Sequence, residues 1–182
     1  MAKRVLVVKT SLRNNSNSDA LAEEFARGAR EAGNEVEVVS LKKKELHFCN
    51  GCLACLKKGR CVILDDAPDL VEKMHDAEVI AFATPIYYYE MSGQMKTLLD
   101  RANPLFGGDY RFQDIYLLMT AADAEKETVD GAVKGLEGWI ACFDRARLAG
   151  TVFGGGADGT GEIAGHPAMK EAYEMGRTIQ CR

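Results

Sequence analysis

The most constraining feature of this sequence is a repeated switch between two hydrophobic patterns. Short apolar runs, typical of buried strands, alternate with segments in which apolar residues recur every three or four positions, as on helices that cover a sheet. Strands are predicted at Arg4–Lys9, Glu35–Leu41, Glu78–Ala83, Asp114–Met119 and Leu148–Phe153. Helical spacing follows each strand, over Leu21–Ala32, Leu70–Ala77, Met95–Ala102, Val129–Phe143 and Ala168–Ile179. This alternation predicts an α/β fold with a parallel sheet and helices on both of its faces.

The strand sequences also favour one strand order. Glu35–Leu41 begins with alternating polar and apolar residues, which suits an edge strand, whereas the first, third and fourth strands are more apolar. This favours the flavodoxin-like order 2-1-3-4-5, whose ligand crevice lies beyond the carboxyl ends of the first and third strands. At 182 residues, the chain is expected to form a single domain spanning 1–182.

Charge and composition exclude several classes of partner. The 23 basic and 27 acidic residues give a net charge of −4, and the two signs are interspersed, so we expect no nucleic-acid partner. The longest apolar runs are too short to span a bilayer, so no membrane association is expected. Met1–Arg4 leads directly into a predicted strand without a secretory or transit peptide, which predicts a cytoplasmic protein with reduced cysteines.

The loop after the first strand has the chemistry of a phosphate site. Among the nine residues Thr10–Ser18 only Leu12 is apolar, and the loop leads into the start of a helix. Backbone N–H groups at a helix start, hydroxyls and the Arg13 guanidinium are all suited to binding a phosphate. The alternative is an ordinary polar surface loop with a Ser or Asn cap.

The loop after the third strand, Thr84–Gln94, contains three consecutive tyrosines. Pro85 fixes φ and keeps the preceding residue extended, so the segment can present backbone donors and flat side chains to a planar ligand. Alternatively, the tyrosines cover the core or form an oligomer contact.

These motifs together resemble a known family. The relevant stretches are Ser11-x-Arg13, Ser16-Asn17-Ser18, Thr84-Pro85-Ile86-Tyr87, Met91-Ser92-Gly93-Gln94-x-Lys96 and Asp100-Arg101. Over essentially the whole chain they resemble the NAD(P)H-dependent FMN reductase branch of the flavodoxin-like flavoproteins. The resemblance implies that the FMN phosphate is held by Ser11, Arg13, Ser16, Asn17 and Ser18, and the isoalloxazine ring by Pro85, Ile86, Tyr87, Tyr88 and Tyr89. It also implies that Thr120 and Ala121 border the flavin or the nicotinamide pocket, while Thr10 stands where the family usually has Gly.

The resemblance further implies a function. NADPH or NADH would pass hydride to bound FMN, and the reduced flavin would pass electrons to an acceptor such as a flavin, a quinone or a similar small molecule. No side chain is expected to act as an acid–base catalyst, because the flavin carries the chemistry. A homodimer or homotetramer is expected by resemblance. One alternative is an electron carrier that exchanges electrons with ferredoxin, and another is a protein that keeps the fold without the flavin.

Four of the six cysteines form a compact run. Cys49-x2-Cys52-x2-Cys55-x5-Cys61 has a spacing that suits four thiolates around one iron–sulfur cluster, and tetrahedral zinc would use the same ligands. The run resembles the motif of archaeal iron–sulfur flavoproteins, although flavin reductases of the same branch resemble this segment too. Bound cluster, reduced thiols and zinc therefore remain as alternatives.

Other features are expected to be structural. Gly154-x-Gly156-x-x-Gly159 matches a dinucleotide fingerprint, but no helix is predicted to open there, so an active-site or subunit-contact loop is expected. Cys142 and Trp139 are predicted to pack in the core, and Cys181 to lie in the tail. The remaining candidates, His47, His75 and His166, are not spaced for joint metal binding and are expected to have local structural roles.

Overall fold

The sheet has the predicted strand order. The computed structural model of the chain describes residues 1–180. Its parallel strands are β1 (Arg4–Lys9), β2 (Glu35–Ser40), β3 (Val79–Tyr87), β5 (Asp114–Thr120) and β6 (Arg147–Gly154). They lie in the order β2-β1-β3-β5-β6, which is 2-1-3-4-5 among the five predicted strands, so the flavodoxin-like α/β fold is confirmed.

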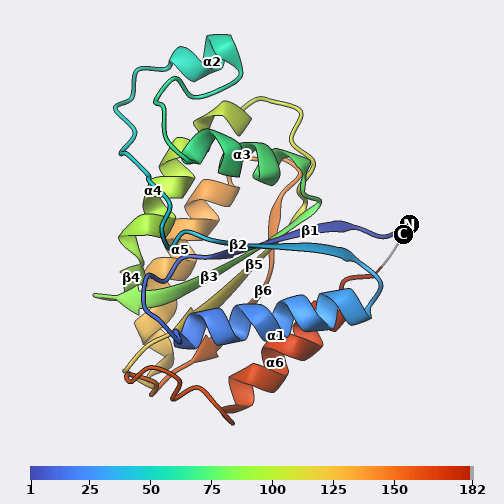
Figure 1. The fold of residues 1–182 in the computed structure, drawn as a ribbon, viewed down its shortest axis with the longest axis vertical. Coiled ribbons are helices and arrows are strands. Elements are labelled where there is room, and N and C mark those ends of the chain that lie inside the picture. The colour runs from blue at the N-terminus through green and yellow to red at the C-terminus, as the bar shows by residue number, and fades with distance from the viewer. Residues whose placement is uncertain (181–182) are drawn as a thin grey trace.

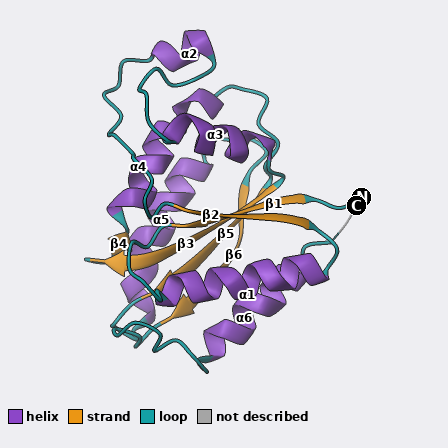
Figure 2. Ribbon diagram, viewed as in Figure 1, coloured by secondary structure: helices purple, strands orange, loops and turns teal. Residues whose placement is uncertain are grey.

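Helices cover both faces of this sheet (Figures 1 and 2). Helices α1 (Asn17–Glu31) and α6 (Pro167–Arg177) lie on one face, and α3 (Ala67–Asp76), α4 (Gly93–Arg101) and α5 (Asp130–Ile140) lie on the other. A further short helix, α2 (Ala54–Lys58), stands apart at one end of the molecule in Figure 1. One short 3-10 turn, Asn103–Leu105, follows α4, and another, Lys126–Val129, precedes α5. Within residues 1–180 we find no helix with the length and apolar character needed to cross a bilayer.

Each face of the sheet has its own apolar core. The strand residues Val5, Val7 and Ala81 pack under α1 and α6, whereas their neighbours Leu6 and Phe82 pack under the helices of the other face. This alternation follows from the pleat of a strand, whose successive side chains point to opposite faces. The core therefore holds the strands rigidly, and the loops at their carboxyl ends are free to form a site.

Three predictions about these elements are corrected by the structure. The segment from Thr84, predicted as a loop, continues β3 through Tyr87 and turns into β4 (Glu90–Met91), which pairs antiparallel to β3. Cys142, predicted in the core, is exposed, because α5 ends at Ile140 and the chain turns outward; its sulfur lies 3.7 Å from the Gly138 carbonyl oxygen. Ile179 is buried as predicted but lies beyond the end of α6.

Other structural predictions agree with what is seen. The Trp139 ring stacks on Phe112 with centroids 5.8 Å apart, which is a packing role. The His166 imidazole caps α6 by accepting a hydrogen bond from the Ala168 N–H. Cys181 lies outside the described residues.

Helices α1 and α6 cross at two glycines. A Cβ on Gly176 would lie 2.1 Å from the Phe25 carbonyl oxygen, and one on Gly28 would lie 2.1 Å from that of Tyr173. Both contacts are with backbone, which cannot move aside without separating the helices. Glycine is therefore required at this crossing.

We expect Gly176→Ala to lower the free energy of unfolding by about 1–3 kcal/mol, the usual cost of overpacking. The matched control is Gly138→Ala on α5, where a Cβ would meet nothing within 4 Å. That change should be neutral or stabilise the chain by up to about 1 kcal/mol. Urea unfolding of the two variants measures the difference, and equal midpoints would contradict the close crossing.

Candidate functional site

A cavity of about 600 Å³ opens at the carboxyl ends of the central strands. It is formed where the loop after β1, the end of β3 and the end of β5 meet, as expected at the switch point of this strand order. Its walls consist of Ser11, Arg13, Ser16, Asn17, Pro85, Ile86, Tyr87, Tyr88, Thr120, Ala121, Ala122, Ala157 and Asp158. We call this space the β1–β3 cavity. Its volume lies within the range of about 300–1,000 Å³ found for small-molecule and cofactor sites.

The start of α1 forms one wall of the β1–β3 cavity. Ser16 is the N-cap residue, yet among the described residues its side chain caps no first-turn amide of the helix; its Oγ lies 3.1 Å from Ser18 Oγ instead. The first N–H groups of this 15-residue helix are therefore available to an anion, and the helix dipole favours negative charge there. Ser11 is 1 % exposed, and its Oγ accepts a hydrogen bond from the Arg13 N–H at 3.2 Å. This wall has the donor chemistry that a phosphate requires.

Asn17 connects this wall to the loop after β6. Its Nδ2 donates to the carbonyl oxygens of Ala157 at 3.0 Å and Gly159 at 2.9 Å, and its Oδ1 accepts from the Ile163 N–H at 3.3 Å. The Arg13 Nη1 also donates to this loop, at 2.9 Å from the Asp158 carbonyl oxygen. The glycine-containing loop is thus held against the start of α1 and forms part of the cavity wall.

The hairpin between β3 and β4 forms the opposite wall. Its two turn residues, Tyr88 and Tyr89, have φ values of 50° and 65°. Two consecutive left-handed residues are typical of a type I′ turn, where Asn-Gly is preferred and bulky residues are strained. Tyr88 lines the cavity and is fully exposed. Strain of this kind is characteristic of functional segments.

Buried hydroxyl groups join the ends of β1 and β3 to the start of α4. The Thr10 Oγ1 donates to the Ala83 carbonyl oxygen at 2.9 Å and lies 3.0 Å from Ser92 Oγ. The Ser92 N–H in turn donates to Thr84 Oγ1 at 3.0 Å. Thr10 therefore has a definite role at the position where a glycine was expected, because its hydroxyl joins the end of β1 to the start of α4.

The structure brings most of the predicted cofactor residues together. Ten of them line the β1–β3 cavity: Ser11, Arg13, Ser16, Asn17, Pro85, Ile86, Tyr87, Tyr88, Thr120 and Ala121. Two do not: Ser18 is buried within the first turn of α1, and Tyr89, 63 % exposed at the second turn position, lies outside the cavity wall. Three further residues, Ala122, Ala157 and Asp158, line the cavity but were not named as candidates. The last two lie in the glycine-containing stretch after the final strand, for which an active-site or subunit-contact loop was predicted.

The four clustered cysteines line a second cavity of about 330 Å³. Cys49, Cys52, Cys55 and Cys61 share its walls with the end of α4 and with Asn103. The Asn103 Nδ2 donates to Cys55 Sγ at 3.1 Å. We call this space the cysteine cavity.

The thiols of the cysteine cavity can be compared with the needs of a single metal ion and of an iron–sulfur cluster. Within the described part of the chain, no three Cys, His or carboxylate side chains converge closely enough for a single metal ion. All four clustered cysteines do line one cavity. The donor set, four thiols, is the one that such clusters use.

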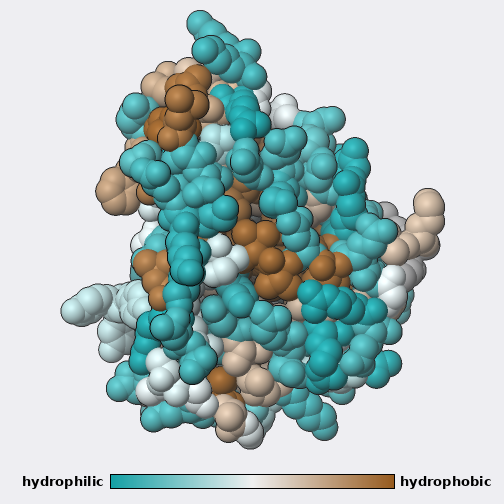
Figure 3. All heavy atoms as spheres, in the orientation of Figure 1, coloured by the Kyte–Doolittle hydropathy of each residue, from teal (hydrophilic) through white to brown (hydrophobic). Residues whose placement is uncertain are grey.

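The outside of this region is unusually apolar for a surface. Phe48, Leu53, Leu56 and Leu64 are between 53 % and 93 % exposed. Figure 3 shows apolar atoms gathered at the end of the molecule that carries α2. Exposed patches of this kind commonly mark an interaction surface.

Comparison with known proteins agrees with this architecture. A family described as NADPH-dependent FMN reductase matches residues 3–159. The chain is 37 % identical over 102 residues to an iron–sulfur flavoprotein of Methanocaldococcus jannaschii, an alignment that covers 56 % of this chain and 53 % of that protein. It therefore spans only about half the length of this relative. An iron–sulfur flavoprotein of Methanosarcina thermophila is 23 % identical over 94 % of this chain and 87 % of its own length.

A solved structure shares the fold over nearly the whole chain. It is an NAD(P)H:quinone oxidoreductase from Methanothermobacter marburgensis, with a TM-score of 0.71 and 18 % sequence identity over 99 % of this chain and 100 % of that one. The predicted resemblance is thus confirmed at the level of fold and family, with FMN and a nicotinamide as the family's cofactor and co-substrate. The chain belongs to the NADPH-dependent FMN reductase family.

Proposed function

We propose that this chain is an FMN-dependent oxidoreductase that takes hydride from NADPH or NADH and passes electrons to a small acceptor such as a flavin or a quinone. The observation that carries the proposal is the β1–β3 cavity, which is lined both by the start of α1, where no described side chain caps the helix, and by the β3–β4 hairpin. FMN, when bound, supplies the hydride and electron chemistry. The chain's own contribution is to bind and orient the FMN and to shape the pocket around it.

In this proposal the two walls bind the two ends of the cofactor. The start of α1, with Ser11, Arg13, Ser16 and the backbone of Asn17 and Ser18, holds the phosphate. The hairpin residues Pro85, Ile86, Tyr87 and Tyr88 hold the ring, with Tyr89 supporting the turn and Thr120 and Ala121 bordering the pocket. The Asn17 side chain acts indirectly, because its amide is already bonded to the loop after β6.

The test of the binding site compares FMN with riboflavin. Two or more charge-assisted hydrogen bonds to the phosphate should make FMN bind about a hundredfold more tightly or better. Arg13→Ala should weaken FMN binding by about tenfold and leave riboflavin unaffected, because one such bond is lost. Fluorescence titration measures both ligands, and equal affinities in the wild type would refute the phosphate site.

A second candidate function is an iron–sulfur flavoprotein that exchanges electrons with a protein such as ferredoxin. The arrangement of four cysteines around one cavity favours it, and relatives named iron–sulfur flavoprotein agree with it. Cys49, Cys52, Cys55 and Cys61 would hold the cluster, which would supply one-electron transfer. Helix α4 runs between the two cavities: Ser92, its N-cap, is bonded to Thr10 and Thr84, and its last residue, Arg101, lines the cysteine cavity.

Metal analysis of anaerobically purified protein tests this candidate. A cluster predicts about four iron and four acid-labile sulfide per chain. Cys52→Ser should remove that iron while FMN binding persists, whereas the control Cys142→Ser, at an exposed cysteine just after the end of α5, should keep it. If the wild-type protein contains no iron, the cluster hypothesis is wrong, and the reductase remains as the candidate function.

We also propose that residues 1–182 form one domain that works as a homodimer or homotetramer in the cytoplasm. The fully exposed Tyr88 at the edge of the β1–β3 cavity supports an assembly, because a second copy would cover it. The free thiols of Cys49, Cys52, Cys55, Cys61 and Cys142 suit a reducing compartment. Sedimentation equilibrium of the purified chain tests the assembly, and a monomer at all concentrations would reject it.

A further inference from the structure

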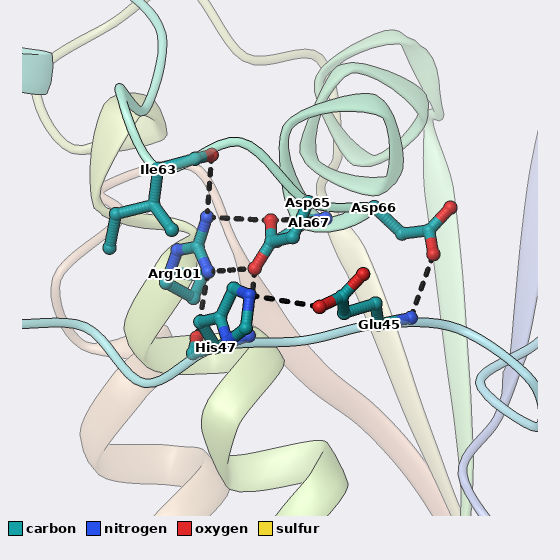
Figure 4. Close-up of polar contacts among 7 residues, drawn as sticks. All are labelled: Glu45, His47, Ile63, Asp65, Asp66, Ala67 and Arg101. Carbon is teal, nitrogen blue, oxygen red and sulfur yellow. Dashed lines mark hydrogen bonds and ion pairs between the residues drawn. The ribbon is translucent and has the colours of Figure 1, made fainter.

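A buried ion pair holds the cysteine segment in place. The side chains of Arg101, at the end of α4, and Asp65, before α3, are both 0 % exposed and pair at 2.5 Å between Nη1 and Oδ2. Figure 4 shows the guanidinium enclosed by Asp65, His47 and Ile63. Arg101 is the largest of the fully buried side chains within the described residues. A charge in such a place requires partners for nearly all of its donors.

Four of the five N–H donors of Arg101 are used to fasten two distant stretches of chain. The Nη1 atom donates to the His47 carbonyl oxygen at 2.7 Å as well as to Asp65, and Nη2 donates to the Asp65 Oδ1 at 2.9 Å and the Ile63 carbonyl oxygen at 3.4 Å. Asp65 completes the link by accepting the His47 N–H at 2.7 Å. The two ends of the segment that carries all four clustered cysteines are thereby joined at one guanidinium.

The fifth donor of Arg101 is unused. Its Nε is buried and has no hydrogen-bond partner among the described residues, although the side chain lines the cysteine cavity. Although burial lowers the pKa of Arg101, its interactions with Asp65 and Cys61 raise it above the usual value. The guanidinium is therefore a charged neighbour of one of the four cysteines. Asn103 already donates an N–H to the sulfur of another, Cys55, from the same wall.

We propose that Arg101 is a positioning residue of the cysteine cavity, which closes the segment 47–65 around a cluster and directs its Nε–H to a sulfur atom there. This inference rests on the second candidate function, because it needs a cluster in the cavity. Outer-shell donors of this kind set ligand orientation and metal retention. An N–H donor and a positive charge beside the sulfurs also favour the reduced, more negative cluster and so raise its reduction potential.

The experiment uses the full chain, purified and reconstituted anaerobically with iron and sulfide. Arg101→Lys keeps the positive charge and a partner for Asp65. It removes the guanidinium, whose two terminal nitrogens both donate to Asp65, and with it the Nε–H. The double variant Arg101→Met/Asp65→Leu removes both charges together, which avoids leaving one of them unpaired. Arg60→Lys is the matched control, because Arg60 lies in the same segment but is exposed and pairs only with Asp69 and Glu72 among the described side chains.

Two readouts are compared at equal FMN content: the rate of iron release to a chelator, and the reduction potential from a titration followed by electron paramagnetic resonance. We expect both Arg101 variants to release iron at least about tenfold faster than the wild type and to have a lower potential, with Arg60→Lys unchanged. A double variant that melts as high as the wild type but still loses iron would separate positioning from general stability. Wild-type release rates and potentials in both Arg101 variants would overturn the inference. A wild type that takes up no iron would overturn the cluster itself and with it this role.

Discussion

Asp65→Asn is expected to destabilise the chain by about 3–5 kcal/mol, the usual cost of breaking a buried ion pair by removing one partner. The substitution leaves the Arg101 charge buried and without a counterion, while its carbonyl partners His47 and Ile63 cannot neutralise it. The matched control is Asp66→Asn at the next position, whose carboxylate is partly exposed and pairs with Lys44. Urea unfolding at neutral pH should show a large shift for Asp65→Asn and almost none for Asp66→Asn. Similar midpoints for the two variants would contradict the burial of this pair.

The same pair predicts a pH dependence. Although burial opposes ionisation, hydrogen bonds from Arg101 and from the backbone of His47 and Ala67 lower the pKa of Asp65 below its usual value. A lowered folded-state pKa contributes stability that is fully present above the unfolded value of about 3.9 and is lost as the pH falls through the folded value. The stability difference between wild type and Asp65→Asn should therefore shrink below about pH 3.9. A difference that stays constant from neutral pH to acid unfolding would be inconsistent with this carboxylate being ionised in the folded state.

Ser16→Asp is expected to stabilise α1 and to abolish tight FMN binding at the same time. Aspartate is a good N-cap residue and its charge suits the start of a helix, so the free energy of unfolding should rise by about 0.5–1 kcal/mol. In the β1–β3 cavity, however, the new carboxylate would accept hydrogen bonds from the backbone N–H groups at the start of α1. It would therefore compete with the FMN phosphate for these groups and would repel its negative charge. Repulsion of about 3 kcal/mol, modest for two charges near 4 Å, corresponds to about a hundredfold weaker FMN binding.

Riboflavin and Ser16→Ala provide the controls for this prediction. Riboflavin lacks the phosphate, so its affinity should not change in Ser16→Asp. Ser16→Ala removes a hydroxyl that would face the phosphate but introduces no charge, so it should weaken FMN binding by about tenfold at most, well below the effect of Ser16→Asp. If Ser16→Asp binds FMN as the wild type does, the phosphate does not bind at the start of α1.

The fold could be predicted from this sequence because each strand and helix follows its own period. Arg4–Lys9 and Asp114–Thr120 each contain an uninterrupted apolar run, and the polar start of Glu35–Ser40 identified the edge strand. The hairpin after Thr84 could not be predicted, because Pro85 and two tyrosines are poor signals for a strand end and a tight turn. The left-handed conformation of these two tyrosines is one that tyrosine rarely adopts, so local preference gave no signal for this turn.

The site residues could be predicted where their place after a strand is enough to bring them together. Residues that follow parallel strands meet at one sheet edge, so Ser11, Pro85 and Thr120 could be brought together without knowing any contact. Contacts between distant segments could not be predicted. The Asn17 side chain bonds to Ala157 across 140 positions. Asp65 pairs with Arg101 across 36 positions.

The reductase function is tested most directly by the visible spectrum of the FMN-loaded chain before and after anaerobic addition of NADPH or NADH, with no other protein present. We expect the oxidised flavin absorption to bleach within the time of catalytic turnover and to return when a quinone is added. A flavin that stays oxidised with both nicotinamides would contradict the reductase function.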